Sequence, residues 1–179
     1  MEQPGVDACS RRMASLVLGR SERTVRRWCD DGTLRVVGSD AGGRALVALD
    51  QVLDMMADGS AEEGAAPAAA DSAQRPHWLR LILDADAGDA DALTCLATEL
   101  LHAGRAAGAV ALLLDAAQLQ QADAMHWLSH CHLHGLGVAR DTDLALMWLH
   151  RAAAQGHAVA RAQSRALRAL CLQGLPQAG

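Results

Sequence analysis

The sequence AMHWLSHCHLHGLGVARDTDLALMWLHRAAAQGHAVA, residues 124–160, decides the fold because parts of its pattern occur twice in the chain. A pattern of Ala, three variable residues, Leu and a small residue spans 92–97 and returns at 124–129, 32 residues later. An alanine pattern at 109–117 returns at 145–153, 36 residues later. Self-similarity at periods of this size predicts a stack of helical hairpins.

The two offsets differ by four residues, so we expect the turn inside the first hairpin to be four residues shorter than the turn inside the second. A third unit would start at Ala160, but Ser164 and Arg168 replace apolar positions of the pattern. The last helix, which we expect to end at about Leu172, is therefore predicted to be a polar cap on the stack. Ahead of the first hairpin, Pro76 is predicted to start a further helix.

The composition agrees with a mainly α fold. Of the 179 residues, 51% are apolar but only 2% are aromatic, with four Trp and no Phe or Tyr. The core must then consist of Leu, Ala, Val and Met, which suits close packing of helices. All 16 basic residues are Arg, and Lys and Asn are absent. Because the missing residues share AT-rich codons, a GC-rich bacterial genome explains the bias, and Arg content alone does not indicate phosphate binding.

Several classes of protein are disfavoured. The five cysteines are scattered and form no CxxC, which disfavours a disulfide framework or a zinc ribbon and favours a reducing compartment. Residues 1–5 are acidic and lack the apolar core of a signal peptide. No uncharged apolar run approaches the roughly 18–20 residues that span a bilayer. We therefore expect a soluble, cytoplasmic protein with no membrane contact.

Residues 58–75 are rich in Ala, Gly, Ser and Asp and contain no periodic large apolar residue, which predicts a flexible linker. The chain is accordingly divided into an N-terminal domain, 1–57, and a helical-repeat domain, 76–179, which we expect to act semi-independently.

The net charge is −5, but residues 11–44 hold eight Arg against four acidic residues. A local basic surface is compatible with nucleic-acid binding.

The N-terminal domain has the signals of three helices and two strands. Gly19 is expected to end the first helix, and Ser21 is expected to cap the second. The remaining elements are the second helix at Glu22–Asp30, strands at Leu34–Val37 and Arg44–Val47 joined by a turn at 38–43, and a last helix at Gln51–Met56 capped by Asp50.

This order of elements, with the motif Ala14-x3-Leu18-Gly19-x-Ser21-x2-Thr24-Val25-x-Arg27-Trp28-x3-Gly32-x-Leu34, resembles the winged helix-turn-helix of the excisionase and MerR-type families. The resemblance implies that the second helix lies in the major groove of double-stranded DNA and that the turn at 38–43 touches the backbone or the minor groove. Glu22 departs in charge from a basic groove helix. The implied DNA-contacting residues are Arg20, Ser21, Arg23, Thr24, Arg26, Arg27 and Arg44.

The second hairpin resembles a Sel1-like repeat, a relative of the tetratricopeptide fold. The matching residues are Ala124, Leu128, Ser129, Gly135-x-Gly137-Val138-x2-Asp141-x3-Ala145-x2-Trp148-x3-Ala152-Ala153-x2-Gly156-x3-Ala160. His132 stands where the family usually has Tyr. The resemblance implies a scaffold that binds another protein and has no catalytic role. We expect Trp148 to pack in the core, and we place the partner contact at Trp127, His130 and His134.

Two metal-site interpretations compete with simpler ones. His126, His130 and His134 are spaced i, i+4 and i+8, but Gly135 ends the helix and no carboxylate or second cysteine lies at matching spacing. The aspartates of 84–91 lack the glycine and glutamate of a calcium loop, so helix capping accounts for them better. We therefore predict no metal and no cofactor, and a histidine-rich surface or groove lining.

No nucleophile motif, glycine-rich phosphate loop or paired buried carboxylates occur in the sequence, so an enzyme is not expected. The first hypothesis is a bacterial transcription regulator whose repeats bind a protein partner or mediate oligomerisation, with a homodimer as one form. The second is an adaptor of a signalling or motility system whose winged domain does not bind DNA. The third is an architectural factor similar to the excisionases.

Overall fold

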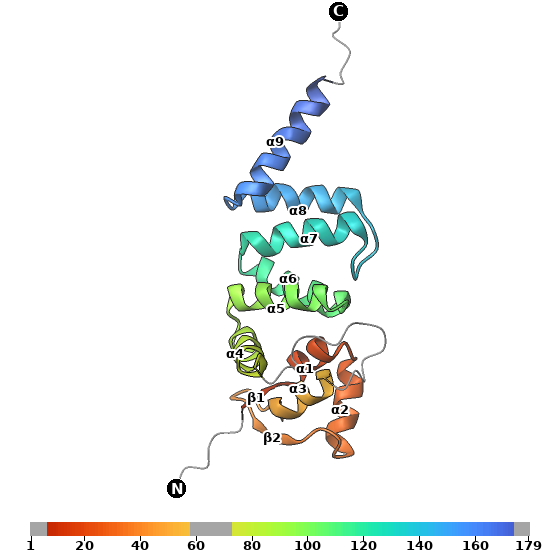
Figure 1. The fold of residues 1–179 in the computed structure, drawn as a ribbon, viewed down its shortest axis with the longest axis vertical. Coiled ribbons are helices and arrows are strands. Elements are labelled where there is room, and N and C mark those ends of the chain that lie inside the picture. The colour runs from red at the N-terminus through yellow and green to blue at the C-terminus, as the bar shows by residue number, and fades with distance from the viewer. Residues whose placement is uncertain (1–6, 58–72, 174–179) are drawn as a thin grey trace, which may run out of the picture.

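The computed structural model describes residues 7–57 and 73–173, with side chains described as far as Ala169. Within these ranges the protein is mainly helical, and most of its helices are stacked along the long axis of the molecule (Figure 1). The elements are β1 Ala8–Ser10, α1 Arg11–Leu18, α2 Glu22–Asp30, β2 Val36–Ser39, β3 Ala45–Ala48, α3 Leu49–Ala57, α4 Arg75–Asp86, α5 Ala90–His102, α6 Ala106–Gln118, α7 Ala122–His134, α8 Thr142–Ala154 and α9 Ala158–Gln173.

The C-terminal part is a short stack of helical hairpins, consistent with an α-solenoid. Helices α5 and α6 form the first hairpin, and α7 and α8 form the second. Their turns are residues 103–105 and 135–141, so the predicted difference of four residues is confirmed. Asp89 accepts a hydrogen bond from the backbone N–H of Ala92 and caps α5, as the capping interpretation of this segment predicted.

The Gly-x-Gly motif of the second hairpin has a packing reason. Gly135 ends α7 in the left-handed conformation. Gly137 has φ of +70°, and a Cβ at this position would collide with the backbone of Ala106, at the start of α6. The turn of the second hairpin thus lies directly on the first hairpin, which only glycine permits.

The N-terminal part contains the expected helices and a small antiparallel sheet of order β1-β3-β2. Helix α1 ends at Gly19 in the left-handed conformation, as predicted. Helix α2 has the predicted bounds, and the Ser21 hydroxyl accepts a hydrogen bond from the Thr24 N–H at 3.2 Å. Val25 and Leu34 are fully buried and hold α2 and the chain that follows it onto this core.

Three local predictions for this part are wrong. Strand β1 was not expected, because three residues carry no alternation and the strand exists through its pairing with β3. Strands β2 and β3 begin slightly later than predicted. Helix α3 starts at Leu49, so Asp50 lies in its first turn and does not cap it. The Asp50 carboxylate instead pairs with Arg35 at 3.3 Å.

The two parts of the chain are packed against each other (Figure 1). Asp86 at the end of α4 accepts hydrogen bonds from the backbone N–H and the hydroxyl of Ser10, both at 2.6 Å. Arg105 donates to the carbonyl of Val17 at 2.7 Å. A Cβ at Gly108 of α6 would collide with the backbone of α1 at Leu16. The expected semi-independence is therefore not observed, because the two parts share one continuous core.

The predicted boundaries 1–57, 58–75 and 76–179 stay a prediction. Residues 58–72 of the predicted linker lie outside the described residues. Arg75, which was assigned to the linker, is the first residue of α4. Its guanidinium donates to Asp54 of α3 at 2.7 Å and to the carbonyl of Asp50 at 2.9 Å. The end of the predicted linker thus contributes to the contact between the two parts.

Candidate interaction sites

An arginine face, formed by Arg23, Arg26 and Arg27, covers the outer side of α2. The three side chains are at positions i, i+3 and i+4, so they project from the same side of the helix, and all three residues are exposed. Together with Thr24 and Asp30 they line a shallow polar hollow. Helix α2 lies at the edge of the molecule, at the opposite end from α9 (Figure 1).

The other predicted DNA-contacting residues surround this face in different ways. The hydroxyls of Ser21 and Thr24 lie 2.9 Å apart and bond to each other at the start of α2. Arg44 lies at the end of the β2–β3 turn, where its side chain is 79% exposed and 3.6 Å from the Asp40 carboxylate. Arg20 is partly buried. The pKa of Arg105 is lowered first by the burial of Arg105 itself and then by the nearby charge of Arg20.

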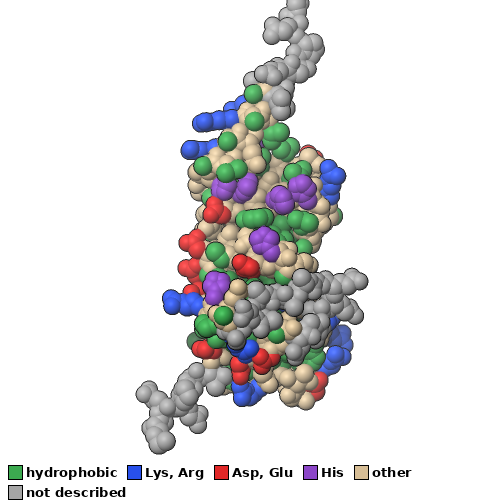
Figure 2. Space-filling model, viewed as in Figure 1, with side chains coloured by type: hydrophobic (Ala, Val, Ile, Leu, Met, Phe, Trp, Pro, Cys, Tyr) green, Lys and Arg blue, Asp and Glu red, His purple; other side chains and the backbone are tan. Residues whose placement is uncertain are grey.

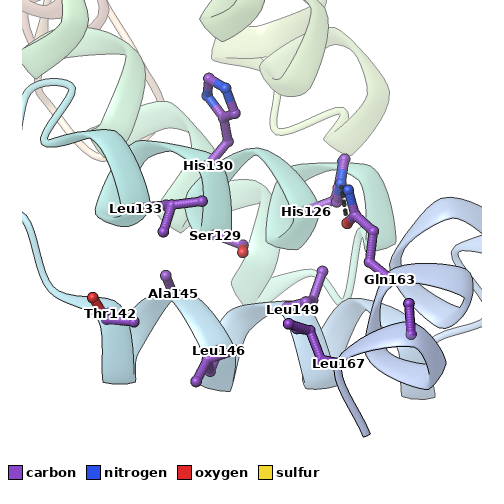
Figure 3. A pocket seen from close by; sticks show the side chains of 11 residues that line it. His126, Ser129, His130, Leu133, Thr142, Ala145, Leu146, Leu149, Gln163 and Leu167 are labelled. Atoms are coloured by element: carbon purple, nitrogen blue, oxygen red, sulfur yellow. Dashed lines mark hydrogen bonds between the residues drawn. The ribbon is translucent and has the colours of Figure 1, made fainter. Parts of the chain in front are cut away.

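A groove of about 510 Å³ lies at the other end of the stack, between the second hairpin and α9 (Figure 3). We call it the C-terminal groove. Its lining is mostly apolar, and it is closed on one side by the contact of His126 with Gln163 at 3.2 Å. Its principal walls are His126 and Leu133 of α7, Leu146 and Leu149 of α8, and Gln163 and Leu167 of α9.

Of the predicted partner-binding residues, only His130 lines the C-terminal groove. The His134 ring packs on that of His130, with centroids 4.4 Å apart, at the end of α7. The Trp127 ring meets the His130 ring edge-on, with centroids 5.7 Å apart, and it also lines a separate hollow with residues of α5, among them Cys95 and His102. The structure therefore places the three predicted rings in one row along α7, which extends from the hollow beside α5 to the C-terminal groove.

Histidine and apolar side chains gather on one face of the helical stack (Figure 2). His126 turns away from His130 and stacks on His157, with ring centroids 4.4 Å apart and planes 23° apart. Burial lowers the pKa of His126, although the hydrogen bond with Gln163 acts in the opposite direction. Burial, followed by the neighbouring charges of His134 and His126, lowers the pKa of His130.

The histidines do not converge on a common point. Among residues 7–57 and 73–173, no group of three or more His, Cys, Asp or Glu side chains is placed to hold a metal ion. Within the same ranges, none of the helices is both long and apolar enough to cross a membrane. Trp148 is partly buried against the core, as predicted, and the Arg151 guanidinium lies 4.9 Å from the centre of its ring.

Sequence reasoning missed the residues in α9 and just before it that complete these surfaces. Gln163 and Leu167 wall the C-terminal groove, and His157 contacts both His126 and Asp123. The repeat pattern gave no sign of Gln163 and Leu167 because it degrades after Ala160. Their signal was the position of a third repeat unit, whose first helix should pack on the second hairpin even where its sequence departs from the pattern.

Residues 122–157 match the family model of the Sel1 repeat. The match covers α7, the turn with its two glycines, and α8. No match is found among curated proteins or among solved structures. The chain therefore contains a Sel1 repeat within a mainly helical fold, and repeats of this kind commonly mediate protein–protein interactions. The N-terminal part lies outside the matched residues.

Proposed function

We propose that this protein is a DNA-binding regulator of transcription whose Sel1 repeat binds a protein partner. The observation that carries the DNA-binding half is the arginine face of α2. Three exposed guanidinium groups project from the same side of α2, the second helix of the expected helix-turn-helix. The resemblance to the excisionase and MerR-type families gives this helix the place of the groove helix.

The chemistry of the arginine face suits a duplex. Arginine forms paired hydrogen bonds to the O6 and N7 atoms of guanine and also binds phosphate oxygens. Arg44 on the β2–β3 turn adds a further exposed cation at the same end of the molecule. Because one small module contacts few phosphates, tight binding calls for two copies of the chain or for tandem sites. The proposal includes no catalysis and no cofactor, and it places the protein in the cytoplasm.

The C-terminal groove supports the protein-binding half. Leu133, Leu146 and Leu167 line it and are each between 37% and 40% exposed, so apolar surface is available to a partner. Burial of such surface contributes roughly 25 cal/mol per Å² before the costs of association. This observation also favours the second candidate function, an adaptor of a signalling or motility system in which α2 does not contact DNA.

The test compares two double variants of the full chain that lose the same charge. Arg26→Ala with Arg27→Ala removes two members of the arginine face, whereas Arg161→Ala with Arg165→Ala removes two exposed arginines of α9. Affinity for duplex DNA is measured as a function of salt concentration. We expect the first variant to lose at least tenfold in affinity. Its slope of log affinity against log salt concentration should be smaller by about 2, since each phosphate contact contributes about 1. The second variant should bind like the wild type.

Sequencing of DNA crosslinked to the protein in its host is the decisive companion experiment. Enriched sites that disappear with Arg26→Ala and Arg27→Ala support the regulator. If no site is enriched, and the double variant keeps its full set of co-purifying proteins, the regulator proposal fails and the adaptor takes its place.

A further inference from the structure

Two histidines join α9 to α7 at the end of the stack. His157 immediately precedes α9, and His126 lies on α7. Their rings are stacked with centroids 4.4 Å apart, and each ring also makes a polar contact between the two helices: His157 Nε2 with Asp123 Oδ1, and His126 Nε2 with Gln163 Oε1, both at 3.2 Å. We call this pair the histidine clasp. The His126 ring and its bond to Gln163 form one wall of the C-terminal groove (Figure 3).

The contacts of His157 require one tautomer of its neutral imidazole ring. Its Nδ1 accepts a hydrogen bond from the Ala160 N–H at 3.0 Å, which caps the first turn of α9. Its Nε2 therefore carries the proton and donates to the Asp123 carboxylate. A second proton can enter only at Nδ1, where it removes the acceptor of the cap. It also places positive charge at the N-terminus of α9, which the helix dipole disfavours.

The two rings oppose each other once both are charged. Two imidazolium rings stacked at 4.4 Å repel, and His126 is partly removed from water. Burial is the first cause that lowers the pKa of His126; the hydrogen bond with Gln163 opposes it, and the charge of His157 lowers the pKa further. The folded state therefore takes up a proton on His126 less readily than the unfolded state does. Neutral His126 stabilises the folded state fully above the ordinary histidine pKa of about 6.5, and this stabilisation is lost as the pH falls.

Among the ionisable groups around the clasp, Asp123 acts in the opposite direction and raises the pKa of His126. Asp123 attracts a charged His157, but its side chain is 63% exposed and the attraction is screened by water. On the side of α5, Cys95 and His102 line the hollow that His157 borders. On α7, His130 adds positive charge below its own pKa, and on α9 the next charged residue is Arg161. Apart from Asp123, each of these groups is neutral or positive in mild acid.

We propose that the histidine clasp is an acid-sensitive latch, which holds α9 against α7 at neutral pH and releases it in mild acid, so that the C-terminal groove opens. The release follows from the loss of the His157 cap and from repulsion between the stacked rings. Histidine is the side chain whose charge changes in this range of pH. The inference concerns the fold of the full chain and does not depend on DNA binding.

Hydrogen exchange of the full chain tests the latch directly. Amide exchange of α9 residues 160–169 is compared with that of α5 at pH 7.5 and pH 5.5, after correction for intrinsic rates. We expect exchange in α9 to rise severalfold relative to α5 at pH 5.5, because the contacts that hold α9 on α7 are lost. Equal protection of α9 at both pH values overturns the proposal.

Two variants separate titration from packing. His157→Asn keeps a side-chain oxygen for the Ala160 N–H, and His126→Gln keeps an amide that can bond to Gln163. The double variant should show no additional exchange at pH 5.5, whereas His150→Gln on the exposed side of α8 should behave like the wild type. A rise in the double variant equal to that of the wild type overturns the proposal.

A measurement on the wild type keeps the test valid if the double variant folds poorly. NMR of the histidine rings at pH 7.5 reports which nitrogen carries the proton. The latch requires His157 to be protonated at Nε2 and bare at Nδ1. A proton on Nδ1 of His157 at neutral pH overturns the proposal, because the cap would then not exist.

Discussion

At the scale of single residues, the glycines of the second hairpin show how the repeat is held together. Gly137 and Gly156 both have positive φ, at +70° and +92°. A Cβ at Gly137 would collide with Ala106, whereas a Cβ at Gly156 would meet nothing within 4 Å. The two positions therefore separate the cost of the backbone conformation from the cost of the contact between the hairpins.

We expect Gly137→Ala to lower the free energy of unfolding by about 2–4 kcal/mol, through strain and a forced shift of the turn. Gly156→Ala should cost only about 1 kcal/mol, the ordinary penalty of a left-handed backbone. Urea unfolding followed by circular dichroism measures both. Equal losses in the two variants would mean that the turn does not rest on α6.

The thiols differ sharply in their surroundings. Cys9 and Cys131 are 0% exposed, and burial raises their thiol pKa values to about 12 and about 11; the charge of Asp86 also contributes at Cys9. Cys95 on α5 is exposed. Since the thiolate is the reactive form, the native protein should be alkylated at Cys95 long before Cys9 or Cys131 at pH 8. Mass spectrometry of the labelled peptides measures the order, and early labelling of Cys9 would contradict the packing of β1.

At the scale of elements, the contact of α1 with α6 joins the two parts of the chain. It depends on the close approach at Gly108, on the Arg105 bond to Val17, and on the ion pair of Arg12 with Asp115 at 2.5 Å. The exposed ion pair adds little on its own. The absence of a side chain at Gly108 is the feature that no neighbour can replace.

A large side chain at Gly108 should force α1 away from α6. We expect Gly108→Leu to unfold in two steps, with the N-terminal part first, where the wild type unfolds in one. Ala107→Leu, at the adjacent and exposed position of the same helix, should keep the single transition. Hydrogen exchange followed separately in α1 and α8 distinguishes the two cases. One common transition in Gly108→Leu would show that the interface does not depend on this approach.

At the scale of the whole molecule, the sequence predicted those features of the fold that depend on local patterns. The hairpins, their unequal turns and the bounds of α2 follow from periodicity, capping residues and glycines, which act over a few positions. The short strand β1 and the docking of α1 on α6 depend on partners far away in the chain, such as Asp86 for Ser10. For the same reason the groove wall from α9 was missed, while His130 on its other side was found.

If the protein binds DNA as proposed above, the firm seating of the N-terminal part on the stack has a consequence for gene control. A partner held in the C-terminal groove would point in a fixed direction from the DNA axis, because the contacts of Arg105 and Gly108 fix the N-terminal part against the helical stack. Promoter activity should then depend on helical phase. Moving the binding site by about 5 bp, half of the roughly 10.5 bp turn, should turn the partner to the wrong side of the DNA and abolish its effect, and a full turn should restore it.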